Sequence, residues 1–191
     1  MRQQRRQQKG SGTLRIIGGD WRGRRLEFPS SPNLRPTGDR IRETLFNWLA
    51  AEVGGSRCLD LFAGSGALGL EALSRGARHC TFLETSSAAI EGINAHLTLL
   101  NAVDRSRVIN TNALSWRDDP FDIVFVDPPF SENLAIDSLR HLVNNQLLTD
   151  SALVYLEVAS TASLEDLPPC LSIVRDKRSG AVRYLLLEQQ P

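Results

Sequence analysis

The sequence predicts an α/β fold with a mostly parallel sheet of seven strands that ends in an antiparallel hairpin, extended by a small basic hairpin at the N-terminus. From Arg57 onward, apolar runs of strand length alternate with helical stretches, which is typical of a parallel sheet covered on both faces. The last two apolar runs have no helix between them, so the final strands should pair antiparallel. The length of 191 residues suits one domain with a small extension.

The N-terminal segments differ in composition from the rest of the chain. Residues 1–12 are mainly Gln, Arg, Lys, Gly and Ser, and we expect a disordered basic arm. Residues 13–38 should form the hairpin extension, with LRIIGG and WRGRRLEF as its strands and a Pro-rich irregular stretch behind them. Residues 39–191 should form the main domain, and Asp39 is expected to cap a helix over residues 40–53.

Periodicity places the elements of the main domain. The expected strands are 57–61, 79–84, 106–110, 121–126, 151–158, 170–176 and 181–188, with residues 176–180 as the last turn. The expected helices are 66–75, 87–101 and 132–146.

Composition excludes several classes of protein. No apolar run approaches the roughly 18 residues of a membrane span, so no membrane partner is expected. Cys58, Cys80 and Cys170 form no CxxC pair, and the three histidines lack ligand-like spacing, so neither a disulfide framework nor a metal site is expected. The N-terminus lacks the apolar stretch of a secretory signal. We therefore expect a cytoplasmic protein.

The formal net charge of zero hides a strong asymmetry. Residues 1–42 contain eleven Lys or Arg and three Asp or Glu, a net charge of +8, whereas the remainder contains eleven and nineteen, a net charge of −8. Arg is more suitable than Lys for phosphate contacts and for stacking on bases, and Arg dominates here. The segregation predicts that a polyanion such as nucleic acid binds the N-terminal part.

The segment CLDLFAGSGALGLEALSRGA reads as a strand, a glycine-rich turn and a helix. Gly64, Gly66 and Gly69 have the GxGxxG spacing of a dinucleotide site, and Glu84 ends the next strand, where it could bind ribose hydroxyls. A nicotinamide enzyme is therefore one interpretation. Asp60 favours another, because an acid before the turn suits the ammonium group of S-adenosylmethionine and would repel a pyrophosphate.

The strand FDIVFVD runs directly into Pro128-Pro129-Phe130. The carboxyl ends of strands are the ligand-binding edge of open α/β sheets, so Asp127 should lie there. The prolines fix the backbone and carry no N–H donors, which leaves carbonyl oxygens that suit an amino group. Asp127, Pro128, Pro129 and Phe130 are the predicted catalytic block: Asp127 and the Pro128 carbonyl would hold the amine hydrogens while Phe130 stacks on a base.

Five blocks together resemble the RsmD family of bacterial 16S rRNA guanine-N2 methyltransferases: RIIGGDWRGRRLEF, RPTGDRIRETLFNWL, LDLFAGSGALGLEALSRGA, DIVFVDPPF and GAVRYLLLE. The resemblance covers nearly everything from Leu14 to Glu188. It implies a Rossmann-like class I methyltransferase fold, S-adenosylmethionine as the methyl donor, and a guanine of 16S rRNA as the target. The substrate would be rRNA within the small ribosomal subunit or its precursor, and we expect a monomer.

The resemblance also implies roles for individual residues. The cofactor-binding set is Asp60, Phe62, Ala63, Gly64, Ser65 and Gly66 around the methionine part, Glu84 at the ribose, and Asn112 with Ala113 near the adenine. Asn112 departs from the acid that the family carries there. The RNA-binding set is Arg15, Trp21, Arg22, Arg24 and Arg25 on the hairpin, with Arg35, Thr37, Arg40 and Arg42 beside the mouth of the site. Trp21 has an alternative role in packing the hairpin on the domain.

Other functions remain open from the sequence. The amine could belong to adenine in DNA or RNA, since DPPF suits exocyclic amines in general. The chain could also be a nonenzymatic RNA-binding assembly factor, which would fail to bind the cofactor.

Overall fold

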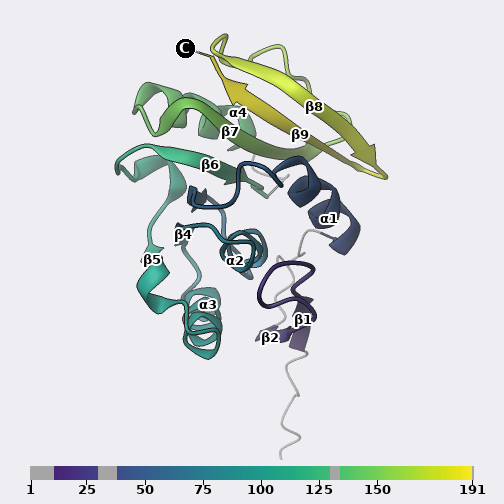
Figure 1. The fold of residues 1–191 in the computed structure, drawn as a ribbon. Coiled ribbons are helices and arrows are strands. Elements are labelled where there is room, and N and C mark those ends of the chain that lie inside the picture. Colours follow the sequence, from purple (N-terminus) through teal and green to yellow (C-terminus); the bar gives the residue numbers. More distant parts are fainter. Residues whose placement is uncertain (1–10, 30–37, 130–133, 191) are drawn as a thin grey trace, which may run out of the picture.

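The computed structural model describes residues 11–29, 38–129 and 134–190, and it confirms the predicted fold class. Its main sheet has the strand order β5-β4-β3-β6-β7-β9-β8 (Figure 1). Neighbouring strands from β5 to β7 are parallel, whereas β9 pairs antiparallel with both β7 and β8. The strands are β3 Arg57–Asp60, β4 His79–Glu84, β5 Ser106–Asn110, β6 Phe121–Val126, β7 Leu148–Ala159, β8 Leu171–Ser179 and β9 Val182–Gln189.

Helices cover both faces of this sheet (Figure 1). Within the described residues the α-helices are α1 Asp39–Trp48, α2 Ala67–Ser74, α3 Ser87–Leu99 and α4 Leu134–Asn144, and the 3-10 turns are η1 Val103–Arg105 and η2 Ala113–Ser115. One core joins α1, α2 and α3 to alternate strand residues such as Phe82 and Phe125. The other core joins α4 to the opposite strand face, including Val124 and Leu156. Every residue of α2 is buried, so this helix is fixed between the sheet and the N-terminal hairpin.

Several predicted boundaries in the main domain were wrong. Strand β7 begins at Leu148 rather than at residue 151. Gly38 is the N-cap of α1 and Asp39 is its first residue, and the helix ends at Trp48 rather than at residue 53. Residues 49–53 continue as turns because Leu49 and Val53 are drawn into the core, and the Val53 N–H bonds the Leu49 carbonyl oxygen at 2.9 Å.

The last turn is shorter than predicted. Strand β8 continues to Ser179, and a two-residue turn at 180–181 joins it to β9. Gly180 has a φ of 60°, which glycine adopts without steric cost. Asp176, expected in the turn, instead lies in the strand and accepts hydrogen bonds from Nη2 and Nε of Arg183 at 2.6 and 3.1 Å. This cross-strand pair stabilises the hairpin beyond residue 176, where the local composition indicated a turn.

The N-terminal hairpin is a separate two-stranded sheet formed by β1 Ser11–Arg15 and β2 Arg25–Pro29. Leu14 lies opposite Leu26, and both are buried in the first core. The predicted strands ran on into residues 16–19 and 21–24, which instead form the connecting loop. The predicted arm also extended too far, because residues 11 and 12 pair in β1. Residues 1–10 lie outside the described residues.

The hairpin loop is attached to α2 by backbone hydrogen bonds. The N–H groups of Ile17 and Gly18 donate to the two carboxylate oxygens of Glu71, at 2.9 and 2.8 Å. The Asp20 N–H bonds the Ser74 carbonyl oxygen at 2.8 Å. Gly19 has a φ of 75°, and a Cβ there would lie 1.9 Å from that same carbonyl oxygen, so only glycine permits this approach.

Glu71 is a fully buried carboxylate at the junction between hairpin, α1 and α2. Besides the two loop N–H groups, it forms ion pairs with Arg75 at 2.8 Å and with Arg42 at 3.6 Å. Arg42 also donates to the Arg15 carbonyl oxygen at 2.9 Å, which ties α1 to β1. A charge at this depth is stabilised only because ionic and hydrogen-bonding partners surround it.

Candidate active site

The predicted site residues meet where adjacent strands end. Strand β3 pairs with β4 on one side and with β6 on the other, so Asp60 at its end lies between Glu84 and the residue that follows β6, Asp127. Asp60 is in register with Phe82 and Phe125, which both belong to the core under α2. This is the sheet's switch point, where open α/β folds bind ligands. The neighbouring positions of β3 and β6 bring the glycine loop and the Asp127-Pro128-Pro129 segment to one edge of the sheet.

The segment 61–66 connects β3 to α2 over this edge. The Leu61 N–H bonds the Phe125 carbonyl oxygen and the Ala63 N–H bonds the Leu83 carbonyl oxygen, both at 3.0 Å. Gly64 and Gly66 have φ values of 53° and 77°, in the left-handed region that glycine tolerates best. The loop is therefore fastened to both neighbouring strands, with Gly66 as the N-cap of α2. Within it Ala63 and Ser65 are buried, and Phe62 is half-buried.

Gly69, the third glycine of the motif, allows close packing of α2 on the sheet. A Cβ at this position would lie 2.2 Å from the Phe82 ring and 2.8 Å from Sγ of Cys80. Its N–H also donates to Oδ2 of Asp60 at 3.0 Å. The helix therefore begins close above the strand end, and the acid is hydrogen-bonded to its first turn.

Glu84 is held rigidly by backbone donors. Oε2 accepts from the Gly64 N–H at 2.8 Å, and Oε1 accepts from the N–H groups of Thr85 and Ser86, each at 2.8 Å. These bonds link the glycine loop to the end of β4. A carboxylate has about four lone-pair sites, so Glu84 still has capacity to accept a ligand hydroxyl.

Asp60 is a fully buried acid of the site. Its pKa is raised to about 7, mainly by burial and also by the nearby carboxylates of Asp127 and Glu84, while the hydrogen bond from Gly69 acts in the opposite direction. Three acids converge on one edge, and together they make it favourable for a cation.

Asn112 and Ala113 follow β5 at the same edge of the sheet. Asn112 Oδ1 accepts from the Leu114 N–H at 2.8 Å and so caps η2. The amide oxygen assigned to an adenine contact therefore already has one partner, although a carbonyl oxygen has a second lone pair. Ala113 is buried.

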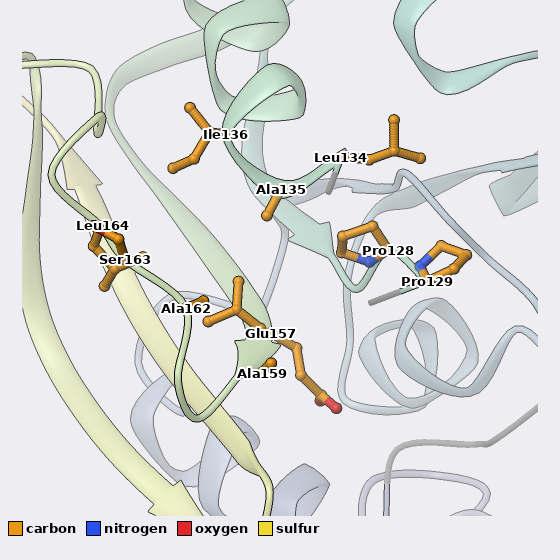
Figure 2. A pocket seen from close by; sticks show the side chains of 11 residues that line it. Pro128, Pro129, Leu134, Ala135, Ile136, Glu157, Ala159, Ala162, Ser163 and Leu164 are labelled. Carbon is orange, nitrogen blue, oxygen red and sulfur yellow. The ribbon is translucent and has the colours of Figure 1, made fainter. Parts of the chain in front are cut away.

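Pro128 and Pro129, which follow Asp127 after the end of β6, line a small pocket of about 70 Å³. Pro128 is buried and Pro129 is exposed. The pocket is shown in Figure 2 and is lined by Pro128, Pro129, Leu134, Ala135, Ile136, Glu157, Val158, Ala159, Ala162, Ser163 and Leu164. Its walls are mostly apolar, which suits the flat face of an aromatic ring. Phe130, the predicted stacking residue, lies outside the described residues.

Glu157 was missed by the sequence analysis. It lies near the end of β7, next to β6, and it is buried with an exposed fraction of 6%. The signal was available, because an acid near the end of an apolar strand is the same pattern that singled out Asp60 and Asp127.

Part of the predicted RNA-binding set is exposed on the surface. Arg15, Arg22, Arg24, Arg25 and Arg40 are exposed, on β1, the hairpin loop, the start of β2 and the first turn of α1. Arg15 also pairs with Asp39 at 3.1 Å. Arg35 and Thr37 lie outside the described residues.

Two members of that set are buried in this structure. Trp21 is only 8% exposed, its backbone N–H bonds Oγ of Ser74 at 3.0 Å, and the Arg105 guanidinium lies 5.7 Å from its ring. These contacts are those of the alternative role, in which Trp21 packs the hairpin on the domain. Arg42 is 1% exposed, because it satisfies Glu71, Asp39 and the β1 backbone instead of facing solvent.

Within the described ranges, no helix is long and apolar enough to cross a membrane. The same part of the chain contains no group of three or more His, Cys, Asp or Glu side chains arranged to hold a metal ion.

Comparisons with known proteins bear on this geometry. The family model described as conserved hypothetical protein 95 matches residues 14–188. The chain is 48% identical to ribosomal RNA small subunit methyltransferase D of Escherichia coli strain K12 over 184 residues, which cover 95% of this chain and 92% of the relative. The chain belongs to the RsmD family. It is also 43% identical to the protein of the same name from Haemophilus influenzae, over 93% of this chain and 94% of the relative.

A solved structure of the Escherichia coli protein yhhF is similar throughout, with a TM-score of 0.87 and 45% identity over 94% of this chain and 99% of that chain. The fold of this RsmD-family chain is thus that of class I methyltransferases. Of the two interpretations of the glycine loop, the methyltransferase is correct and the nicotinamide enzyme is not.

The residues present fit S-adenosylmethionine, the cofactor of such enzymes. Asp60 offers a buried carboxylate for an ammonium group, and Glu84 is fixed by three N–H groups beside the loop. A Cβ at Gly66 would lie 3.1 Å from Ile93, so this turn also has no room for a larger residue without adjustment. When bound, the cofactor supplies an electrophilic methyl group on sulfur.

We predict that the raised pKa of Asp60 makes cofactor affinity depend on pH. The free protein retains the Asp60 proton up to about pH 7, while the cofactor's ammonium favours the ionised carboxylate, so binding releases a proton. Affinity should therefore rise about tenfold between roughly pH 5.5 and 7, before the ammonium itself titrates near its ordinary pKa of about 8. Calorimetric titration measures this slope.

Asp60→Asn is the control for this prediction. The amide preserves the size of the side chain and does not titrate, so its cofactor affinity should be lower and flat over the same pH range. An unchanged slope in this variant would assign the pH dependence to another group.

Proposed function

We propose that the protein transfers a methyl group from S-adenosylmethionine to the exocyclic N2 amine of a guanine in 16S rRNA. The observation that carries this proposal is the position of Asp127-Pro128-Pro129, directly after β6 and beside the glycine loop that follows β3. This arrangement brings an acceptor for amine hydrogens to the strand end next to the cofactor loop.

An exocyclic base amine is a poor nucleophile, because its lone pair is delocalised into the ring. Asp127 and the Pro128 carbonyl oxygen would accept its two hydrogens and favour a pyramidal nitrogen whose lone pair faces the methyl group. Phe130 would hold the plane of the base. Most of the acceleration would come from orientation, which can contribute roughly 7 to 11 kcal/mol.

The choice of RNA rests on charge and on the family. Arg22, Arg24 and Arg25 are exposed on the hairpin, which is fixed to α2 and so presents them on a rigid support. The two relatives compared above are named as methyltransferases of small-subunit ribosomal RNA. A base must also be turned out of its stack to reach the site, as enzymes that modify bases require. We propose small ribosomal subunits or their precursors as the substrate, with the protein acting as a cytoplasmic monomer.

Incubation with labelled S-adenosylmethionine identifies the polymer that is modified. We expect label in small subunits or in 16S rRNA, and none in duplex DNA. Label confined to DNA would contradict the proposal, and calorimetry without any cofactor binding would indicate a nonenzymatic assembly factor.

Arg24→Ala combined with Arg25→Ala should weaken RNA binding mainly by loss of phosphate contacts. The slope of log affinity against log salt should decrease by about 1.4, since each phosphate contact on a single strand contributes about 0.7. Binding measured by fluorescence anisotropy over a salt series tests this. Arg175→Ala with Arg178→Ala removes the same charge from the exposed β8 strand and should leave the slope unchanged; an equal effect there would show that only total charge matters.

A further inference from the structure

Glu157 and Asp127 extend from neighbouring parallel strands at the same level. Val126 is in register with Leu156, so the next residue of each strand, Asp127 and Glu157, also lie opposite each other, and strands are about 4.8 Å apart. Successive side chains of a strand point to opposite faces of the sheet. Val126 and Leu156 point into the second core, so Asp127 and Glu157, which follow them, point to the opposite face, the one that carries Phe125 and Tyr155. The two acids therefore flank one position at the sheet edge.

The Glu157 carboxylate is oriented by its own strand. Oε2 accepts a hydrogen bond from the Tyr155 hydroxyl at 2.7 Å. Burial, together with the charges of Glu157 and Asp127, raises the pKa of Tyr155 well above its ordinary value, so this hydroxyl stays a donor. Figure 2 shows that the carboxyl group of Glu157 points away from Ile136 and Leu164. It therefore lies outside the apolar part of the pocket.

A fixed carboxylate in this position distinguishes among bases that carry an amine. Guanine presents N1–H next to its N2 amine, so one edge offers donors to both acids. Adenine and 2-aminopurine present N1 as an acceptor, which a carboxylate repels. A site built to accept a hydrogen bond discriminates strongly, because the wrong base leaves its buried polar groups unpaired.

We propose that Glu157 reads the Watson–Crick edge of the target base by accepting N1–H, while Asp127 and the Pro128 carbonyl oxygen hold the amine. The proposal rests on the proposed function and names the residue that would select guanine over other bases with an exocyclic amine. The burial of Glu157, its bond from Tyr155 and its place opposite Asp127 on the neighbouring strand support it. A carboxylate has about four lone-pair sites, so it can accept a base N–H besides the bond from the Tyr155 hydroxyl.

The test compares guanosine with 2-aminopurine at the methylated position of 16S rRNA reconstituted into small subunits. Both bases carry the 2-amine, and only guanine has N1–H. The wild type should favour guanosine, whereas Glu157→Gln, whose amide can donate to an unprotonated N1, should reduce the guanosine to 2-aminopurine ratio of kcat/KM by about 30- to 100-fold. Glu165→Gln removes one exposed acid from the loop after β7 and should leave the ratio unchanged.

Each outcome is informative. If Glu157→Gln lowers kcat/KM for both bases by the same factor, the role of Glu157 is structural. If it leaves both values unchanged, Glu157 has no role in the reaction. Either result overturns the inference. Circular dichroism melting shows whether the variant is folded. A folded variant with an unchanged ratio contradicts recognition of the base by Glu157. If the wild type modifies no guanosine, the proposed function fails before Glu157 is tested.

Discussion

Asp127→Ala should reduce methyl transfer by at least about a thousandfold while cofactor affinity stays within about threefold. The carboxylate follows β6, where the proposed function places the amine, whereas the cofactor is expected over the segment from Asp60 to Gly66 and at Glu84. Loss of an interaction made mainly in the transition state lowers kcat and kcat/KM together. Single-turnover transfer to small subunits and calorimetric titration of S-adenosylmethionine measure the two quantities separately.

Asp127→Asn is the matched control, because its amide oxygen still accepts one amine hydrogen. We expect it to retain more activity than the alanine variant. If Asp127→Ala lost cofactor affinity in parallel with transfer, the division of the edge into an amine side and a cofactor side would be wrong.

Glu71→Ala should lower the free energy of unfolding by about 3 to 5 kcal/mol, which corresponds to a Tm decrease of roughly 10 °C for a chain of this size. The mutation removes the buried carboxylate that pairs with the 1%-exposed Arg42 and that accepts the Ile17 and Gly18 N–H groups. Uncompensated burial of charge and backbone donors is the physical reason. Urea denaturation followed by circular dichroism gives the free energy.

Asp176→Ala provides the comparison. Asp176 pairs with Arg183 at 2.6 Å on the surface of the β8–β9 hairpin, and exposed pairs contribute only about 0 to 1 kcal/mol. A cost for Glu71→Ala no greater than that of Asp176→Ala would show that the hairpin is not anchored through Glu71.

The parallel sheet could be predicted because its inner strands, such as β4 and β6, are buried on both faces. Apolar runs such as FDIVFV are bounded by turns and can be read without knowledge of their partners, and three of the predicted strands, 79–84, 106–110 and 121–126, match the structure residue for residue. Boundaries failed where tertiary contacts decide them. The continuation of β8 depends on Arg183 across the turn, and the end of α1 depends on the burial of Leu49 and Val53.

Much of the site could be predicted because it depends on local sequence. A residue at the carboxyl end of a parallel strand lies at the binding edge of the sheet, independently of the order of the strands. That argument located Asp60, Glu84 and Asp127. It also applied to Glu157, which was overlooked because no glycine or proline motif follows it.

The burial of charged residues could not be predicted locally. Arg42 lies in basic, surface-like sequence, yet it faces inward because it pairs with Glu71 and the β1 backbone, whereas for Trp21 the sequence left packing open as an alternative. Only Glu71 carried a hint, as a lone acid in the otherwise apolar stretch that became a fully buried helix. A charge in such a helix needs partners. Its partners are N–H groups of the hairpin loop and the side chain of Arg42, which are distant from Glu71 in the sequence.

The central claim, N2 methylation of guanine, is tested most directly by mass spectrometry of nucleosides from small subunits methylated by the purified protein. We predict N2-methylguanosine at a single 16S rRNA position, and loss of that nucleoside from rRNA of cells that lack the protein. N6-methyladenosine in its place, or no methylated guanosine, would contradict the account.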